Sequence, residues 1–206
     1  MTSDRRIWDT AYGQRGQLWA GMPPALAARL PAGRVLELGC GNGKMLPFLS
    51  REGSESIGLD FSRAALMAAK ARSCLQPDPH LVLADATLLP FKSGMLDAVL
   101  ARHVIGHADP PGREQISCEI HRVLRPGGIF HFSGFSQRDF RYGQGTLCGE
   151  GSFVRGNGIR THYFTREEVL LLFSRFTCTG IEVTEWNLRI RGRDHTRSEI
   201  HALFSR

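Results

Sequence analysis

One short segment near residue 40 has the residue types and the spacing that ligand binding needs. Its apolar residues 35–38 lead into a run in which Gly39, Gly41 and Gly43 occupy alternate positions. Glycine has no Cβ, so the backbone can turn sharply there and a ligand can lie directly against the main chain. A glycine-rich turn between a buried strand and a helix start binds ligands in many α/β folds. The segment predicts a ligand site, with a purely structural turn as the alternative.

The spacing of these glycines excludes two common ligand motifs. The dinucleotide motif Gly-x-Gly-x-x-Gly would need a glycine at the position of Lys44. The phosphate-binding motif that ends in Gly-Lys-Ser/Thr would need a glycine in place of Leu38 and a hydroxyl residue in place of Met45. What remains is a glycine turn with an acidic residue, Glu37, two positions before its first glycine.

Acidic residues also end the next two strand-like segments. Asp60 follows residues 56–59, and Asp85 follows residues 80–84. A carboxylate at such a strand end can accept hydrogen bonds from both hydroxyls of a ribose. Either residue alone is explained as well by a surface or capping role. Their order behind the glycine turn favours a ligand that contains a ribose.

The ordered series resembles the motifs of class I S-adenosylmethionine-dependent methyltransferases, of the type 11 kind, over residues 34–132. Residues 119–128 match the family's signature Glu-x-x-Arg-x-Leu-x-Pro-Gly-Gly. The resemblance implies S-adenosylmethionine as cofactor, with Asp60 on its ribose, Asp85 on its adenine amino group, and no metal. The cofactor-binding residues that it implies are Glu37, Gly39, Cys40, Gly41, Asn42, Gly43, Asp60, Phe61, Asp85, Ala86, Ala101, Arg102 and His103.

Methyl transfer from a sulfonium is an in-line displacement, so an enzyme mainly aligns the partners and excludes water. A base is needed only where the acceptor must lose a proton. His103, His107 and Tyr163 are the candidate catalytic residues, and a structural role is the alternative for each histidine. The candidate substrate-binding residues are Trp8, Tyr12, Arg138, Arg141 and His162.

Two resemblances within the family indicate different acceptors. Residues 104–107, with the glycine turn, resemble methyltransferases that esterify the carboxymethyl group of the tRNA wobble uridine. Residues 153–158 and 162–165 resemble the small-molecule and tellurite-resistance type. We predict a small-molecule acceptor, with tRNA as the alternative and a non-catalytic, cofactor-binding partner subunit as a third reading. The arginines that favour RNA are Arg189, Arg191, Arg193 and Arg197.

The elements that must position these residues form one domain over residues 1–206. Strands alternate with helices, which predicts a doubly wound, mostly parallel sheet with helices on both faces. The family resemblance adds a seven-stranded order with an antiparallel C-terminal hairpin. Residues 1–30 are expected to form a helical lid, broken at Pro23 and Pro24. Residues 135–162 are expected to form a long, mobile loop that covers the substrate.

Composition sets few further limits on function. The net charge of +6 leaves an acidic substrate or RNA open without requiring either. The five cysteines have no Cys-x-x-Cys spacing, which argues against a zinc site and a disulfide framework. No apolar run is long enough to span a membrane, and residues 1–19 do not resemble a signal peptide. We therefore expect a cytoplasmic monomer or homodimer that does not bind membranes.

Overall fold

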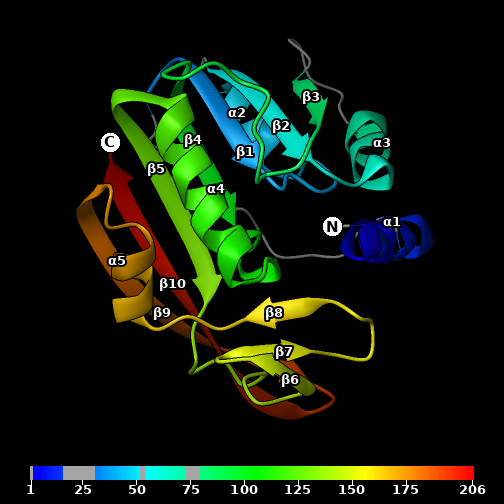
Figure 1. The fold of residues 1–206 in the computed structure, drawn as a ribbon. Coiled ribbons are helices and arrows are strands. Elements are labelled where there is room, and N and C mark those ends of the chain that lie inside the picture. Colours follow the sequence, from blue (N-terminus) through cyan, green and yellow to red (C-terminus); the bar gives the residue numbers. More distant parts are fainter. Residues whose placement is uncertain (1, 16–30, 52–53, 73–78) are drawn as a thin grey trace.

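Seven strands form one sheet in the order β3-β2-β1-β4-β5-β10-β9 (Figure 1). The computed structural model describes residues 2–15, 31–51, 54–72 and 79–206. Strands β1 to β5 run parallel to one another, and β10 runs antiparallel to both β5 and β9. The predicted fold class is confirmed. The strands are β1 (Arg34–Leu38), β2 (Glu55–Asp60), β3 (His80–Leu83), β4 (Leu96–Arg102), β5 (Leu124–Phe135), β9 (Thr177–Ile190) and β10 (Arg193–Ser205).

Helices cover both faces of this sheet because both faces of its central strands are apolar. On β1, Val35 packs in a cluster with Leu46 of α2, whereas Leu36 and Leu38 join the larger core that α4 and α5 cover. The side chains of a strand alternate between its two faces, so β1 contributes to two separate cores. The helices are α1 (Thr2–Arg15), α2 (Leu46–Arg51), α3 (Arg63–Arg72), η2 (Ile105–His107), α4 (Pro110–Val123) and α5 (Arg166–Leu172).

Local sequence signals determine where two of these helices begin and where the final hairpin turns. Ser62 Oγ accepts a hydrogen bond from the Ala65 amide at 3.1 Å, and Thr165 Oγ1 accepts one from the Glu168 amide at 3.1 Å. These two hydrogen bonds are the N-caps of α3 and α5. The turn between β9 and β10 uses Arg191 and Gly192, both with positive φ, which suits a tight hairpin.

The structure corrects the expectation of an irregular loop over residues 135–162. A three-stranded antiparallel sheet forms there from β6 (Thr146–Gly149), β7 (Ser152–Val154) and β8 (Arg160–His162). Strand β5 ends at Phe135, inside the segment that was expected to be a loop. Short strands separated by glycines give a weak periodic signal, which is why the segment resembles a loop in sequence.

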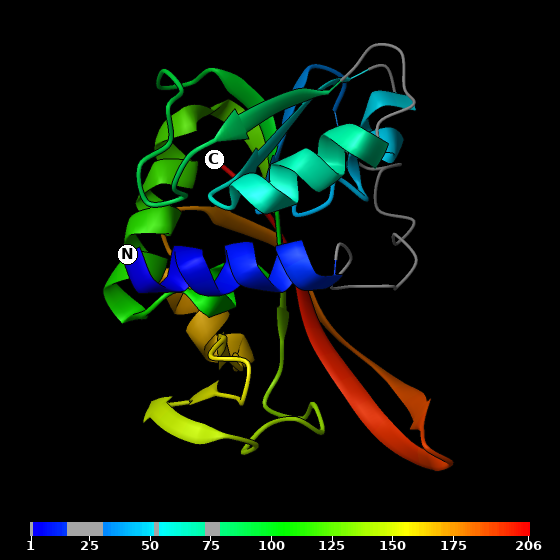
Figure 2. The ribbon, with the colours of Figure 1, turned by 90° about the vertical axis from the view of Figure 1, so that its right-hand side faces the viewer.

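Helix α1 lies across the carboxyl ends of the parallel strands, above the β9–β10 hairpin (Figure 2). Residues 2–15 of the predicted lid are helical, and the rest of it, with the proline break, lies outside the described residues. None of the described helices is both long and apolar enough to cross a membrane. The described residues include no group of three or more potential ligands arranged to hold a metal ion.

Candidate functional site

A cavity of about 520 Å³ opens where the carboxyl ends of β1, β2 and β4 meet the underside of α1. In doubly wound sheets, ligands bind outside the carboxyl ends of the strands, where the strand order reverses. The order reverses here between β1 and β4. The volume is within the range of small-molecule and cofactor sites.

The glycine turn forms one wall of this cavity. Gly39, Gly41 and Gly43 have φ values of 67°, 54° and 69°, which residues with a Cβ rarely adopt. Gly39, Gly41 and the intervening Cys40 line the cavity together with Asn42. Gly43 does not line the cavity. It lies against α3 instead, where a Cβ added to Gly43 would come within 3.0 Å of the Cβ of Ala69. Its role is therefore the close packing of the turn against α3.

The two strand-end carboxylates lie where the sequence predicts. Asp60 lines the cavity and is 7% exposed, and it accepts amide hydrogen bonds from Gly41 at 2.9 Å and Ser62 at 2.8 Å. Burial raises the pKa of Asp60, although these amide bonds oppose that rise. Asp85 also lines the cavity and accepts hydrogen bonds from the amide and hydroxyl of Thr87. The structure thus brings both carboxylates to one site.

Other predicted cofactor contacts are also found in the lining. Phe61 and Ala86 flank the two carboxylates, and Arg102 and His103 lie at the end of β4. Ala101, like Gly43, is an exception, because its side chain is fully buried in the main core and does not line the cavity. Alternation along β4 turns Ala101 away from the site while its neighbour Arg102 faces the cavity.

Glu37 and Arg102 lie close together beside the glycine turn and interact electrostatically. Burial raises the pKa of Glu37 to about 8, and the Arg102 guanidinium partly offsets that rise. Glu37 Oε2 and Arg102 Nε are both buried and have no hydrogen-bond partner among the described residues. Buried polar atoms are normally paired, so a missing partner needs an explanation. A ligand with a donor and an acceptor close together would satisfy both atoms.

Helix α1 forms the roof of the cavity through Trp8 and Tyr12. The Tyr12 hydroxyl fills the space that a Cβ at Gly41 would need. Asp9 fixes the helix, since its carboxylate accepts hydrogen bonds from Ser62 Oγ at 2.7 Å and the Ala64 amide at 3.3 Å. The predicted placement of Trp8 and Tyr12 beside the ligand site is thus matched by the geometry.

The two histidines after β4 both line the cavity but differ in their surroundings. His107 Nδ1 donates to the Arg160 carbonyl at 2.6 Å, and its ring meets Trp8 edge-on at 4.8 Å. Burial lowers the pKa of His107 to about 4, so it is neutral at pH 7 and a weak base. This arrangement favours the structural alternative for His107. His103 is the better candidate base.

Tyr163 does not line the cavity, which corrects its expected catalytic position. Its ring is almost fully buried and packs against Phe135, Tyr142 and Phe153. His162 is buried behind η2, with Ser152 Oγ 2.8 Å from its Nδ1. Both residues are therefore structural contacts between the small sheet and the main domain.

The predicted substrate arginines also lie outside the cavity. Arg138 is largely exposed and pairs with Glu185 at 3.4 Å. Arg141 is buried, pairs with Asp139 at 2.8 Å, and lies over the ring of Phe135 at 4.0 Å. Among the described residues, none from 136 to 162 lines the cavity, so the small sheet supports the site from behind. A substrate-covering role of residues 135–162 stays a prediction.

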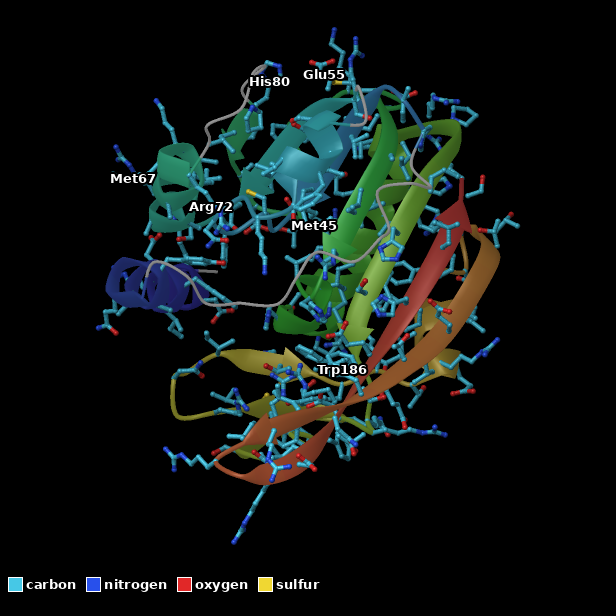
Figure 3. The ribbon with its side chains drawn as sticks, turned by 180° about the vertical axis from the view of Figure 1, so that it is seen from behind. Met45, Glu55, Met67, Arg72, His80 and Trp186 are labelled. Carbon is cyan, nitrogen blue, oxygen red and sulfur yellow. The ribbon has the colours of Figure 1, made fainter. Side chains whose placement is uncertain are left out.

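Four cavity residues lie on the C-terminal hairpin, and of these the sequence analysis singled out Arg197 alone, as a possible RNA contact. Arg197, Glu199 and His201 of β10 and Trp186 of β9 line the cavity opposite the glycine turn. Figure 3 shows Trp186 on the hairpin and Met45, another lining residue, beside the glycine turn. The sequence does contain a signal that groups three of them, because residues 197, 199 and 201 are alternate positions of one strand and must lie on the same face. Which face the strand turns to the site follows only from its pairing with β5.

Comparison with known proteins identifies the domain. The family described as "Methyltransferase domain" matches residues 36–132. A tRNA N(3)-methylcytidine methyltransferase of Drosophila melanogaster is 28% identical over 194 residues, which cover 82% of this chain and 60% of that protein. A malonyl-[acyl-carrier protein] O-methyltransferase of Enterobacter lignolyticus is 36% identical over 125 residues, which cover 59% of this chain and 48% of that protein.

The fold comparison agrees with the domain match. The structure of an S-adenosylmethionine-dependent methyltransferase from Methanosarcina mazei superposes with a TM-score of 0.73 and 23% identity, covering 91% of this chain and 99% of that one. The chain spans 60% or less of the length of the curated relatives named above. Residues 36–132, which carry the glycine turn and both strand-end carboxylates at one cavity, match the methyltransferase domain family, and the chain has the fold of S-adenosylmethionine-dependent methyltransferases.

Proposed function

We propose that the protein transfers the methyl group of S-adenosylmethionine to a small molecule. The observation that carries the proposal is one cavity with two chemically distinct halves. The glycine turn, Asp60 and Asp85 line one half, and the β9–β10 hairpin lines the other with Arg197 and Glu199. A donor in the first half would present its methyl group toward an acceptor in the second.

The residues of the first half suit this cofactor. Its amino-acid end carries an ammonium group and a carboxylate, which complement the unpartnered Glu37 Oε2 and Arg102 Nε. Asp60 would hold the ribose and Asp85 the adenine amino group, with Phe61 and Ala86 beside the base. Binding the ammonium group would favour the ionised form of Glu37, whose pKa burial raises to about 8 in the free protein.

The cofactor supplies an electrophilic methyl group when bound, so the chain itself needs little covalent chemistry. Trp8 and Tyr12 of α1 would exclude water from the reacting groups, and the glycine turn would fix the donor. Phe135 and Trp186 offer flat apolar walls to the acceptor. Their contribution is alignment, which accounts for much of the rate in such reactions.

Calorimetry and a labelled-methyl assay test the proposal together. The protein should bind S-adenosylmethionine and its demethylated product with micromolar-scale affinity, typical of enzyme ligands. Incubated with the cofactor labelled in its methyl group and a cell extract, it should transfer label to the small-molecule fraction. Displacement by NAD at equal affinity would contradict the cofactor assignment. Binding without transfer to any fraction would instead support a non-catalytic partner subunit.

A tRNA acceptor is the second candidate, and the hairpin favours it. Cross-strand pairs on the cavity face combine an apolar residue with a basic one, as in Trp186 with Arg197 and Ile190 with Arg193. Aromatic surfaces next to cations bind single-stranded nucleic acid by stacking and phosphate contact. Label in the RNA fraction, reduced by Arg193→Ala and by high salt, would select this reading over the small molecule.

A further inference from the structure

Two arginines share one buried carboxylate beside the β9–β10 hairpin. The side chain of Asp139 has no exposed surface, and it accepts from Arg141 Nε at 2.8 Å and from Arg197 Nε at 2.6 Å. Burial opposes ionisation of Asp139, but the hydrogen bonds from the two guanidinium groups lower its pKa overall. Asp139 is therefore ionised at pH 7 and balances only one of the two positive charges.

Hydrogen bonds to β10 hold Asp139 in this place. Just after β5, the Ser136 amide donates to the Ser198 carbonyl at 3.0 Å, and the Asp139 amide closes a turn onto the Ser136 carbonyl at 3.0 Å. The Asp139 carboxylate also accepts from the Ser198 amide at 3.3 Å. Because Arg197 precedes Ser198 on β10, its Nε meets a carboxylate whose position is already fixed.

The two arginines differ in which of their nitrogens are used. Arg141 does not line the cavity, and both its Nε and its Nη2 donate to Asp139. Arg197 lines the cavity and uses only its Nε for Asp139. Among the described residues, no acceptor pairs with the two terminal nitrogens of Arg197, and no second carboxylate forms an ion pair with it. A planar pair of N–H donors is therefore available at the cavity wall.

Aromatic rings frame the Arg197 guanidinium. Its Cζ lies 4.8 Å from the centre of the Phe135 ring and 5.5 Å from that of Trp186, its cross-strand partner in the hairpin. Both rings line the cavity, and Trp186, which Figure 3 shows on the hairpin, is 39% exposed. Cation–π contacts hold a guanidinium in place without using its N–H groups. The exposed indole surface remains available to stack on a ligand.

Glu199, two residues further along β10, is the other carboxylate of the hairpin that lines the cavity. Its Oε1 lies 3.3 Å from His103 Nε2 and its Oε2 lies 3.5 Å from His201 Nε2, so it faces the histidines and not Arg197. Burial opposes its ionisation, but the hydrogen bond from His103 and the nearby positive charges lower its pKa overall. The sulfonium of a bound donor offsets this negative charge, which leaves the charge of Arg197 for the acceptor.

We propose that Arg197 binds a carboxylate of the acceptor through its two terminal nitrogens, and that Trp186 stacks on a flat ring next to that carboxylate. The inference rests on the proposed methyl transfer and adds the chemical class of the acceptor, an aromatic or conjugated carboxylic acid. The planar guanidinium fork matches the two oxygens of a carboxylate. A single unbalanced charge suits a carboxylate better than a phosphate monoester, which carries nearly two charges.

The bound carboxylate serves as an anchor, and the methyl group goes to another atom of the acceptor. The guanidinium stabilises the negative charge of the carboxylate, which makes its oxygens weaker nucleophiles. The same contact fixes the position of the ring, and an in-line displacement depends on such alignment. The methylated product therefore keeps its carboxylate.

Calorimetry with two matched probes tests the site without turnover. 2-Naphthoate carries a carboxylate on a flat ring, and 2-naphthamide has a similar shape without the charge. The protein saturated with S-adenosylmethionine should bind the naphthoate at least about tenfold more tightly than the amide, the scale of a charge-assisted pair. Equal affinity for the two probes, or no naphthoate binding at its solubility limit, would overturn the proposal. Tighter binding of 2-naphthyl phosphate would overturn its choice of anion.

Substitutions then assign the preference for naphthoate to Arg197. Arg197→Gln should abolish it, whereas the matched control Arg138→Gln should keep it, because Arg138 forms only an exposed ion pair with Glu185 outside the cavity. Arg197→Lys retains a charge beside Asp139 and serves if Arg197→Gln does not fold. Its single ammonium lacks the planar fork, so the preference should fall several-fold. Full preference in either folded variant would make Arg197 a structural partner of Asp139 only.

Trp186→Ala tests the stacking contact separately. It should weaken the binding of naphthoate and naphthamide to a similar degree, because both probes have the same ring. Unchanged affinity for both probes in the folded variant would remove Trp186 from the acceptor site.

The labelled product of the transfer assay tests the anchor. It should be retained on an anion-exchange resin and keep its label in mild alkali, and Arg197→Gln should raise KM by about tenfold with a smaller change in kcat. Label released by alkali as methanol would show that the carboxylate itself is methylated, and label in the RNA fraction would exclude a small carboxylic acid. Either result overturns the proposal. If the unmodified protein transfers no methyl group, the proposed function fails, while the naphthoate titrations still decide whether Arg197 binds a carboxylate.

Discussion

Glu37 is the residue whose ionisation most directly links the cofactor half of the cavity to stability. Its pKa rises from 4.5 in the unfolded chain to about 8 in the folded protein. Between these values the native state holds a proton that the unfolded state has lost. The contribution of Glu37 to the free energy of unfolding is therefore fully present below pH 4.5. It decreases as pH rises toward 8, by at most about 1.4 kcal/mol per pH unit.

Glu37→Gln should therefore make the cofactor-free protein more stable than the unmodified one at pH 8, because the amide stays neutral. It should also weaken S-adenosylmethionine binding, since it removes the negative charge that faces the ammonium group. Denaturant titrations at pH 5 and pH 8, with calorimetry at pH 8, measure both effects. Equal stability of the two proteins at pH 8 would contradict the raised pKa of Glu37.

Gly41→Val should abolish cofactor binding at a modest cost in stability. Valine disfavours the φ of 54°, and its Cβ would occupy the space of the Tyr12 hydroxyl. The roof helix and the turn would then separate where the cofactor approaches the main chain. Calorimetry reports binding, and circular dichroism confirms the fold. Micromolar binding by the folded variant would place the cofactor elsewhere.

Asp60→Ala should weaken cofactor binding by about 1.5–3 kcal/mol, the usual scale for lost hydrogen bonds to a charged group. The same carboxylate also holds the Gly41 and Ser62 amides, so some loss of stability is expected. Asp60→Asn is the useful comparison, because it keeps the shape and one acceptor oxygen. If a folded Asp60→Ala protein binds S-adenosylmethionine as tightly as before, Asp60 does not contact the cofactor.

The sequence predicted the cavity residues on the parallel strands better than those on the hairpin, for a physical reason. Glu37, Asp60 and Asp85 lie at the carboxyl ends of strands that are adjacent in the sheet, so strand order brings them together. Arg197, Glu199 and His201 reach the same cavity only because β10 inserts beside β5. Nothing local to residues 193–205 encodes that pairing. Tyr163 and Arg141 show the reverse error, since polar groups in a glycine-rich segment resembled ligands but became packing residues.

At the scale of secondary-structure elements, the carboxylate of Asp9 links α1 to the N-terminus of α3. Asp9 accepts hydrogen bonds from Ser62 Oγ and the Ala64 amide. Asp9→Ala should destabilise the protein by about 1 kcal/mol and weaken cofactor affinity several-fold, because the roof opens more often. Arg5→Ala is the control, since its exposed pair with Asp9 at 4.0 Å contributes little.

Thermal unfolding and calorimetry measure the two effects on α1 separately. A loss of stability without a loss of cofactor affinity would make α1 a packing element only.

The N-caps of α3 and α5 and the final hairpin were predictable because short-range signals fix them. The small sheet of β6, β7 and β8 was not, because strands of three or four residues between glycines lack a period.

The whole molecule should show a stability maximum near neutral pH in the absence of cofactor. Burial lowers the pKa of His131 to about 3 and of His107 to about 4, so their unfolded forms bind protons that the native state does not. Stability therefore falls as pH drops below 6.5. The opposite effect of Glu37 reduces it as pH rises toward 8.

Urea titrations from pH 4 to pH 9 locate this maximum, which we expect at about pH 6.5–7. Glu37→Gln should flatten the alkaline side and steepen the acid side between pH 4.5 and pH 6.5, because Glu37 opposes the two histidines over that range. The fall in stability that remains below pH 6.5 then belongs to the buried histidines. A maximum below pH 5 in the unmodified protein would mean that the buried histidines accept protons without unfolding.

The position of β10 also has a consequence for how the site is completed during synthesis. The glycine turn, Asp60 and Asp85 all precede residue 110, and the strands that carry them are parallel neighbours. Glu199 and His201 are translated 96 and 98 residues after His103, and β9 can join the sheet only through β10. On the ribosome, the part of the cavity at the glycine turn can therefore assemble while the part lined by the hairpin is still missing. A nascent chain arrested before residue 193 would have the glycine turn but would lack Arg197, Glu199 and His201.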